Sequence, residues 1–264
     1  MLNPETNACK ICGSRSNLAF QATLLKKHLV GYYHCGACGF MQTQEPFWLA
    51  EAYLSSINTA DTGILARNLW ITRNISVLLY SFFDRSSKFL DFAGGYGILV
   101  RMMRDIGFDF YWQDPYTQNL VARGFEIQLG MGKFEAVTSI ESFEHFVNPL
   151  DEIEKMLSFS RTIIFTTELL PSPVPKPMDW WYYGLDHGQH ISFYSRQALE
   201  TIAKRFGLRF LTAGGVHLFT DKKISPLMYK IMLKFGHYGY SSFVVRNMSS
   251  RTEKDMYSIE KGCS

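Results

Sequence analysis

The stretch from Phe89 to Gly97 constrains the fold of this chain more than any other segment. It reads Phe-Leu-Asp-Phe-Ala-Gly-Gly-Tyr-Gly, which is a short apolar run, an acid at position 91 and three glycines. An apolar segment with helical spacing follows as far as Ile106, so the pattern predicts a strand, a tight turn and a helix. Glycines in such a turn let the main chain approach a ligand closely, because no Cβ stands in the way.

The ligand suited to this turn differs from a dinucleotide. A dinucleotide fingerprint has a glycine three residues after Gly97, where the helix presents its N-terminus to a pyrophosphate. That position is Val100. Asp91, at the tip of the predicted strand, can instead face a positively charged group. The turn therefore favours a ligand without pyrophosphate and with a positive group, and it disfavours an NAD-type oxidoreductase.

Further acids follow at the ends of later predicted strands. An aromatic segment leads into Asp114, which lies 23 residues after Asp91 (114 − 91), about one strand–helix–strand step. An acid at that place can accept hydrogen bonds from both hydroxyls of a ribose. A third apolar segment, 134–140, ends at Glu141. Because ligands of parallel sheets bind at the carboxyl ends of the strands, these acids mark a predicted cofactor site.

These segments resemble, in the same order, the motifs of the class I S-adenosylmethionine-dependent methyltransferases. The resemblance covers about residues 61–207. It departs from the usual pattern at Ala93, where a glycine is common, and at Glu135, where an aspartate is common. It implies that S-adenosylmethionine is the cofactor and that the glycine turn and the strand ends bind it. The residues concerned are Asp91, Gly94, Gly95, Gly97, Asp114 and Glu141.

The predicted strands and helices alternate, which is typical of a mostly parallel, doubly wound sheet with helices on both faces. Strands are expected at 88–92, 108–113, 125–129, 136–140, 162–167, 208–211 and 216–220. Helices are expected at 47–54, 61–83, 98–106, 117–123, from 149 onward, from 195 to 206, and at 226–235. The resemblance makes this α/β arrangement a seven-stranded, Rossmann-like methyltransferase fold.

Four of the five cysteines form two pairs with the spacing typical of zinc sites. Cys9 and Cys12 make one C-x2-C pair, Cys35 and Cys38 make the other, and 22 residues lie between the pairs. Four thiolates fill a tetrahedral shell, so the predicted zinc is structural. A ribbon of ~35 residues needs the metal for its stability. The ribbon could bind nucleic acid, bind protein or cover the acceptor pocket. We favour a structural or substrate-covering role.

Catalysis of methyl transfer requires alignment and, for many acceptors, a base. The methyl group leaves a sulfonium by in-line displacement, and alignment can supply up to about 7–11 kcal/mol. A hydroxyl or carbon acceptor also needs a base, and histidine titrates near neutral pH. The candidates are His145, His187 and His190, of which the resemblance favours the last two. No carboxylate cluster with the spacing of an open metal site is evident outside the cysteine pairs, so metal-dependent transfer is not expected.

The sequence thus predicts a zinc ribbon at 1–45, a methyltransferase domain at 46–248 and a polar, frayed tail at 249–264. Similar N-terminal zinc modules occur in enzymes that resemble sugar methyltransferases. The expected reaction is methyl transfer to oxygen, nitrogen or carbon of a small molecule, such as a sugar or a secondary metabolite. Two alternatives stay open: an RNA methyltransferase that holds its substrate with the ribbon, and a cofactor-binding protein without catalysis.

Composition and charge bear on partners and compartment. The formal net charge is +3 and 19% of residues are charged, whereas a dedicated nucleic-acid binder shows a clear basic excess. A nucleic-acid partner is therefore disfavoured. Residues 1–10 are polar, unlike a signal peptide, and no run approaches the ~20 apolar residues that span a bilayer. We expect a cytoplasmic protein that does not enter a membrane.

Overall fold

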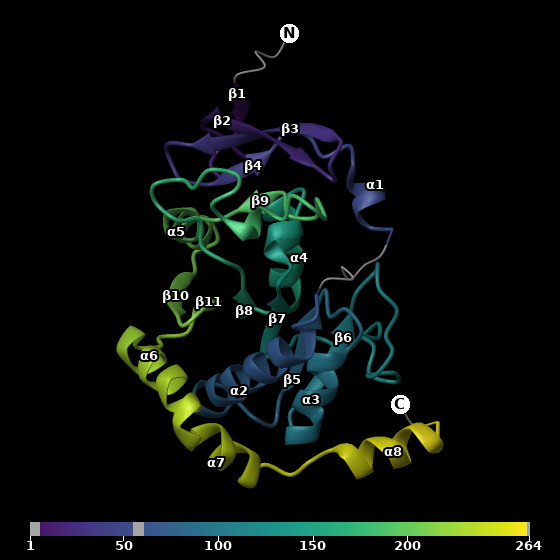
Figure 1. Ribbon diagram of the computed structural model, residues 1–264. Coiled ribbons are helices and arrows are strands. Elements are labelled where there is room, and N and C mark those ends of the chain that lie inside the picture. The colour runs from purple at the N-terminus through teal and green to yellow at the C-terminus, as the bar shows by residue number, and fades with distance from the viewer. Residues whose placement is uncertain (1–5, 55–60, 263–264) are drawn as a thin grey trace. The chain divides into compact units, whose positions relative to one another are not determined.

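The computed structural model describes residues 6–54 and 61–262. The chain divides into two compact units, each assembled from separate stretches of sequence. The first unit comprises Met1–Thr59, Glu141–Lys155 and Thr166–Phe210, and the second comprises Ala60–Ile140, Met156–Phe165 and Leu211–Ser264. Figure 1 labels the helices and strands along the chain.

An antiparallel five-stranded sheet, in the order β1-β2-β3-β4-β9, lies in the first unit. Its strands are β1 (Thr6–Ala8), β2 (Arg15–Leu24), β3 (His28–Cys35), β4 (Met41–Thr43) and β9 (Ser192–Phe193). Strand β9 lies far along the sequence from the others, and it pairs with β4 through Met41↔Phe193 and Gln42↔Ser192. The predicted zinc ribbon therefore supplies four strands of this sheet, and a later segment supplies the fifth.

Aromatic side chains form much of the core of the first unit. The Tyr183 ring lies 5.6 Å from that of Tyr32 and 5.3 Å from that of Phe193, measured between centroids, and all three are buried. Tyr182 is buried in the same cluster, whereas Trp181 is 76% exposed. The aromatic run at 180–183 therefore serves mainly as core packing.

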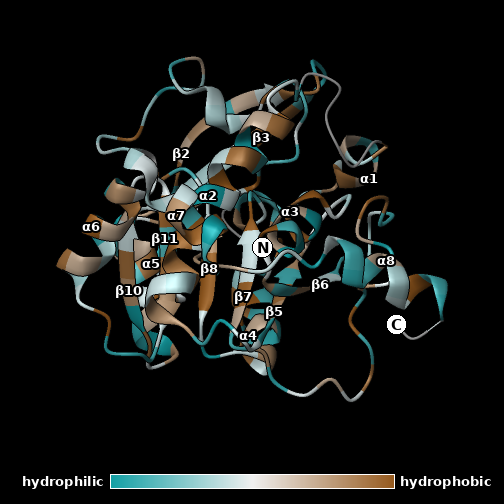
Figure 2. Cartoon of the chain, turned by 90° about the horizontal axis from the view of Figure 1, so that it is seen from below, coloured by the Kyte–Doolittle hydropathy of each residue, from teal (hydrophilic) through white to brown (hydrophobic). Residues whose placement is uncertain are grey.

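A second sheet has six strands in the order β10-β11-β8-β7-β5-β6, counted within the residues described. The strands are β5 (Lys88–Phe92), β6 (Asp109–Gln113), β7 (Ala136–Ile140), β8 (Ile163–Thr166), β10 (Arg209–Ala213) and β11 (Val216–Thr220). Strand β5 pairs in parallel with both β6 and β7. Its apolar residues are buried, as expected for a strand covered on both faces. The hydrophobic colouring of Figure 2 is prominent on β8 and β11.

The helices begin and end largely where the sequence signals predict. They are α1 (Leu49–Ala52), α2 (Ile64–Phe82), α3 (Ile98–Ile106), α4 (Pro149–Phe159), α5 (Arg196–Arg205), α6 (Pro226–Phe235), α7 (Ser241–Arg246) and α8 (Thr252–Glu260). The predicted cap Ser195 accepts a hydrogen bond from the Ala198 N–H, which satisfies a free donor at the start of α5. None of these helices is both long and apolar enough to cross a membrane.

Two predicted elements between β6 and β7 are wrong. Residues 117–123, all of which are described, form no helix; the Leu120 and Val121 N–H groups donate to the Tyr96 carbonyl, at 3.1 and 3.2 Å, instead of to carbonyls of their own segment. The predicted strand 125–129 contributes a single parallel bridge, Trp112↔Glu126. Left-handed glycines at 130 and 132 follow closely and turn the chain away from the sheet, which explains six strands in place of seven.

The C-terminal segment also differs from the predicted frayed tail, because it forms helix α8 with a buried acid. Asp255 is 3% exposed. It accepts two hydrogen bonds from Arg104, at 2.8 and 2.7 Å, and one from Arg101 at 2.8 Å. The Arg104 guanidinium also donates to Asp109 at 2.7 Å and lies 3.6 Å from the centroid of the Phe125 ring. These contacts fasten α8 to α3 and β6 within the second unit.

Candidate functional site

The glycine turn between β5 and α3 is packed too closely to hold side chains. A Cβ on Gly94 would lie 2.8 Å from the Trp112 ring and 2.9 Å from an Asp91 carboxylate oxygen. A Cβ on Gly97 would lie 2.7 Å from the Asn119 side-chain oxygen, and Gly97 has φ +83°. Only glycine fits at either position. Packing against the rest of the protein therefore requires glycine at these two positions of the turn, which we call the glycine cradle.

Polar contacts hold the middle of this turn. The Gly95 N–H donates to Asp114 Oδ2 at 2.9 Å, and the Gly95 carbonyl accepts from Trp112 Nε1 at 2.8 Å. Ala93, which replaces the usual first glycine, adopts a left-handed φ of 57°. That conformation costs an alanine roughly 1–2 kcal/mol, so the surrounding contacts impose it.

Asp91 is a buried carboxyl group at the end of β5. It is 2% exposed, and its Oδ1 accepts from Thr138 Oγ1 at 2.6 Å. The pKa of Asp91 is raised to about 7, mainly by burial and also by the nearby Asp114, while the hydrogen bond from the Thr138 hydroxyl lowers it. A positively charged ligand group beside Asp91 would favour its ionised form. The position thus suits the cationic methionine moiety of S-adenosylmethionine.

Asp114 connects the glycine turn to the loop that follows β6. Besides the Gly95 N–H, its carboxylate accepts from the Tyr116 N–H at 2.8 Å and the Thr117 N–H at 3.0 Å. An ionised carboxylate has about four lone-pair sites, so it retains acceptor capacity for a ribose hydroxyl. The cradle, Asp91 and Asp114 all belong to the second unit and together fit S-adenosylmethionine.

Glu141, the sixth predicted cofactor residue, belongs to the first unit. It follows β7 with a left-handed φ of 48°, and its N–H donates to Thr166 Oγ1 at 3.0 Å. A glutamate in that conformation is strained, and strained residues are concentrated at functional sites. Its assignment to the cofactor stays a prediction.

The four paired cysteines converge as predicted for a zinc site. Their sulfur atoms all lie within 4.8 Å of one another, with Cys9 3.6 Å from Cys38 and Cys12 3.5 Å from Cys35. Those separations are far above the ~2.05 Å of a disulfide. They are close to the ~3.8 Å between sulfurs that Zn–S bonds of about 2.3 Å give in a tetrahedron. The donor set fits a structural zinc ion.

The three predicted catalytic histidines gather in the first unit. The ring of His190 lies 5.0 Å from that of His145 and 4.7 Å from that of His187, between centroids. Burial lowers the pKa of each of the three. For His187 and His190, the pKa falls further because His145 lies nearby. The Tyr53 ring also lies 6.1 Å from His145.

Hydrogen bonds distinguish the tautomers of these histidines. His145 Nδ1 lies 3.0 Å from the Gln189 carbonyl, and His190 Nδ1 lies 2.6 Å from the Tyr182 carbonyl. Because a carbonyl only accepts, we assign the hydrogen of both rings to Nδ1, which places the lone pair of each neutral ring on Nε2. His187 is the opposite case, because its Nδ1 accepts from the Gln189 N–H at 3.1 Å.

A buried acid that the sequence did not single out joins this group. Glu144 has no exposed surface, and ligand atoms of Glu144, His145 and His190 all lie within 4.8 Å of one another. The sequence shows no metal-site spacing here, because 45 residues separate His145 from His190 (190 − 145). The signal available was the adjacent Glu144-His145 pair directly after a predicted strand.

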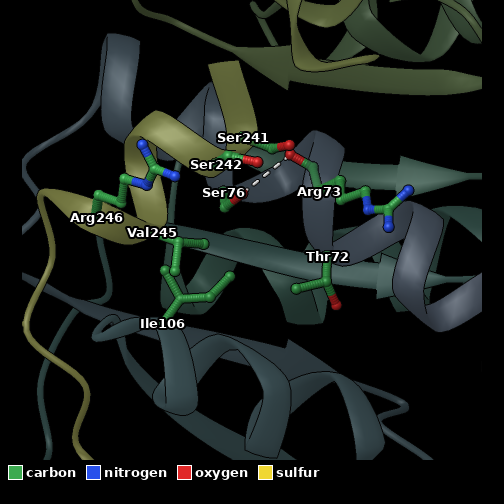
Figure 3. A pocket seen from close by; sticks show the side chains of 8 residues that line it. All are labelled: Thr72, Arg73, Ser76, Ile106, Ser241, Ser242, Val245 and Arg246. Atoms are coloured by element: carbon green, nitrogen blue, oxygen red, sulfur yellow. Dashed lines mark hydrogen bonds between the residues drawn. The ribbon is translucent and has the colours of Figure 1, made fainter. Parts of the chain in front are cut away.

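Figure 3 shows a surface pocket of about 340 Å³ in the second unit, apart from the residues described above. Arg73 and Arg246 stand at opposite sides of it. Its lining contains none of the predicted cofactor, metal or catalytic residues. The eight lining residues are Thr72, Arg73, Ser76, Ile106, Ser241, Ser242, Val245 and Arg246.

The parallel sheet, the glycine cradle and the strand-end acids define a class I, S-adenosylmethionine-dependent methyltransferase. A family model described as "Methyltransferase domain" matches residues 66–213, which is 148 of the 264 residues (213 − 66 + 1). The chain belongs to this methyltransferase family. A comparison with curated proteins found no match.

Several solved structures are similar to this chain at low sequence identity. The plantazolicin methyltransferase BpumL, solved with a monoazolic desmethylPZN analog and SAH, is 13% identical; the match covers 76% of this chain and 88% of that one, with a TM-score of 0.48. A possible histamine N-methyltransferase from Thermotoga maritima is 9% identical over 66% of this chain and 99% of that one, with a TM-score of 0.46. Human N-acetylserotonin methyltransferase, solved with SAM, is 13% identical; the match covers 67% of this chain and 66% of that one, with a TM-score of 0.43.

Proposed function

We propose that this enzyme transfers the methyl group of S-adenosylmethionine to a small molecule, such as a sugar or a secondary metabolite, at oxygen, nitrogen or carbon. The observation that carries the proposal is the histidine cluster, which presents two Nε2 lone pairs among buried aromatic side chains. Such lone pairs suit removal of a proton from a neutral acceptor. The small net charge of +3 accords with an acceptor other than nucleic acid.

In the proposed reaction the acceptor atom attacks the methyl carbon in line with the sulfur. The new bond to carbon forms as the S–CH3 bond breaks, and its electron pair stays on sulfur, giving neutral S-adenosylhomocysteine. The proton of the acceptor leaves to the histidine cluster. Within the cluster, His190 and His145 are the stronger candidates because their Nε2 atoms carry lone pairs, whereas His187 presents an N–H there.

We further propose that the zinc ribbon acts by positioning the histidine segment. The Trp48 indole donates to the Gly188 carbonyl at 2.8 Å, and Gln189 Nε2 donates to the Ala52 carbonyl at 2.9 Å. The Thr43 N–H donates to the Ile191 carbonyl at 3.0 Å. These bonds bracket His190 on both sides, so the ribbon and the residues after it would set the orientation of that ring.

Cofactor binding is tested by calorimetric titration with S-adenosylhomocysteine, with NAD as the negative control. Asp114→Ala is expected to weaken binding of S-adenosylhomocysteine roughly 10- to 150-fold, because hydrogen bonds to a charged carboxylate contribute about 1.5–3 kcal/mol. Asp114 also accepts three main-chain N–H groups, so the thermal unfolding of the variant is measured alongside. A loss below threefold in a folded variant contradicts the assignment, and so does binding of NAD.

The histidine cluster is tested by turnover with an acceptor found by screening methyl-transfer activity. We expect His190→Ala to lower kcat by about 10²–10⁴-fold, the usual contribution of acid–base catalysis, while affinity for S-adenosylhomocysteine stays within threefold. His187→Ala is expected to have a smaller effect. Full turnover in both variants would refute the role of the cluster.

A further inference from the structure

We propose that Glu144, His145 and His190 bind a divalent transition-metal ion, separate from the structural zinc of the cysteines. Their ligand atoms lie within 4.8 Å of one another, in a place where Glu144 is fully buried. Two imidazoles and one carboxylate form a recognised ligand set for catalytic zinc and for non-haem iron. Three protein ligands leave coordination positions open, in contrast to the closed shell of four thiolates.

The hydrogen bonds behind the two histidines have the form expected of metal ligands. A ligating histidine usually donates its other ring N–H to a carboxylate or a main-chain carbonyl, which fixes the tautomer and the ring orientation. His145 does this with the Gln189 carbonyl and His190 does it with the Tyr182 carbonyl. With the hydrogen assigned to Nδ1, Nε2 is the nitrogen of each ring that would bind an ion.

The backbone around the three ligands is tied together by bonds between distant segments. The Glu144 carbonyl accepts from the Ile191 N–H at 2.8 Å. The Phe143 carbonyl accepts from Tyr194 Oη at 2.9 Å, and the Phe146 carbonyl accepts from Ser192 Oγ at 2.8 Å. The two segments that carry the ligands, the turn 143–145 and the loop before β9, are thus joined by hydrogen bonds next to the ligands, which is the support that a metal site needs.

The ligand types select the class of ion. Imidazole nitrogen favours zinc, iron, cobalt, nickel and copper, whereas magnesium and calcium prefer sites made wholly of oxygen. A buried carboxylate is also stabilised by coordinating a cation. The expected occupant is therefore a first-row divalent transition metal rather than magnesium or calcium.

The role of this ion rests on the proposed function, whereas its binding does not. A hydroxyl acceptor at an open coordination position would lose its proton more readily, because a bound cation stabilises the oxyanion. The O–H bond breaks with release of the proton to water, the O–CH3 bond forms, and the S–CH3 bond breaks with its electron pair remaining on sulfur. His145 and His190 then act as ligands, and the ion takes over the activation that imidazole would otherwise provide.

Cobalt titration of the zinc-loaded, full-length protein tests the binding directly. Protein with one zinc per chain is titrated with Co2+ while visible absorption and bound metal are measured. We expect one further equivalent of cobalt, with ligand-field bands of a nitrogen and oxygen environment and without a thiolate charge-transfer band. Magnesium in excess should not displace it. A chain that takes up no second ion, or takes cobalt only into the cysteine site, overturns the proposal.

Substitutions at two of the proposed ligands test whether the second ion binds at this place. Glu144→Gln keeps the size of the side chain, and His190→Ala removes one imidazole; each should weaken cobalt binding at least tenfold. The matched control is His28→Gln, because His28 forms a histidine–carboxylate pair with Glu51 at 3.0 Å in the same unit but belongs to neither of the ligand clusters found among the described residues. Unchanged cobalt affinity in Glu144→Gln, or equal loss in His28→Gln, would rule out this location.

Parallel titrations separate this inference from the proposed function. Binding of S-adenosylhomocysteine and methyl transfer that persist without a second metal ion would leave the proposed function standing and remove the role of the ion. Cobalt binding by a protein that does not bind S-adenosylhomocysteine would support the metal site and refute the methyltransferase assignment. Circular dichroism of each variant shows whether it is folded; the metal count of the unmodified protein decides the proposal even if a variant does not fold.

Discussion

Removal of the zinc ion is expected to unfold the antiparallel sheet of the first unit and to abolish methyl transfer. The structural zinc of small modules contributes about 10–16 kcal/mol to folding at neutral pH, which exceeds the stability of most whole domains. Strands β2, β3 and β4 pair with one another and pack on the aromatic core, but a module of this size gains much of its stability from its metal. Since β4 pairs with β9, which begins two residues after His190, loss of the ribbon also releases the histidine segment.

The measurement combines Cys12→Ser with chelation of the unmodified protein, followed by circular dichroism, zinc content and turnover. Cys263→Ser is the matched control, because this cysteine belongs to neither pair and lies outside the described residues. Affinity for S-adenosylhomocysteine should change less than turnover, because the proposed cofactor residues Asp91 and Asp114 belong to the second unit. A zinc-free protein with an intact β-sheet spectrum and full activity would show that the metal is dispensable.

Replacement of Asp255 by alanine is expected to lower the free energy of unfolding by about 3–5 kcal/mol, the usual cost of removing one partner of a buried ion pair. The substitution leaves the buried Arg104 guanidinium without two of its hydrogen bonds. Because Arg104 keeps Asp109 as a partner, we expect the loss of unfolding free energy to lie near the lower end of this range. Urea unfolding at neutral pH measures the change.

Two further variants serve as controls for the loss of unfolding free energy expected of Asp255→Ala. Glu253→Ala removes an exposed acid from the same helix, so its effect on unfolding should stay below about 0.5 kcal/mol. The double replacement of Arg104 by methionine and Asp255 by leucine removes both charges together, and it should recover part of the loss because no buried charge remains unpaired. A change below about 1 kcal/mol for Asp255→Ala would mean that α8 contributes little to the fold.

Local sequence signals were sufficient for the central part of the fold. The predicted limits of β5, α3 and β7 agree with the structure residue for residue, because apolar runs, helical spacing and the glycines between β5 and α3 specify these elements without reference to distant residues. The cradle at Gly94 and Gly97 and the convergence of the four cysteines were predicted for the same reason, since fixed short spacings carry their geometry with them.

Features that depend on contacts between residues far apart in the sequence could not be predicted from the local sequence pattern. Strand β9 has two residues, too few to show an alternation of apolar and polar side chains. It is a strand because its backbone pairs with β4. Asp255 resembles any surface acid until Arg104 is placed opposite it. The Glu144 cluster depends on a turn after β7 meeting a loop 45 residues later. In each case tertiary contacts, rather than local propensity, decide the outcome.

At the proposed cofactor site, the raised pKa of Asp91 would link release of its proton to binding of the cofactor. In the folded chain the carboxyl has a pKa of about 7, well above the ordinary value for aspartate. Its contribution to folding stability therefore declines as the pH rises from about 4 toward 7, because the folded chain is then the form that retains the proton. A cation bound beside Asp91 would favour release of that proton and offset the penalty. If the proposed assignment of Asp91 to the cofactor is right, the affinity for the methyl donor depends on pH through one carboxyl group, before any acceptor is bound.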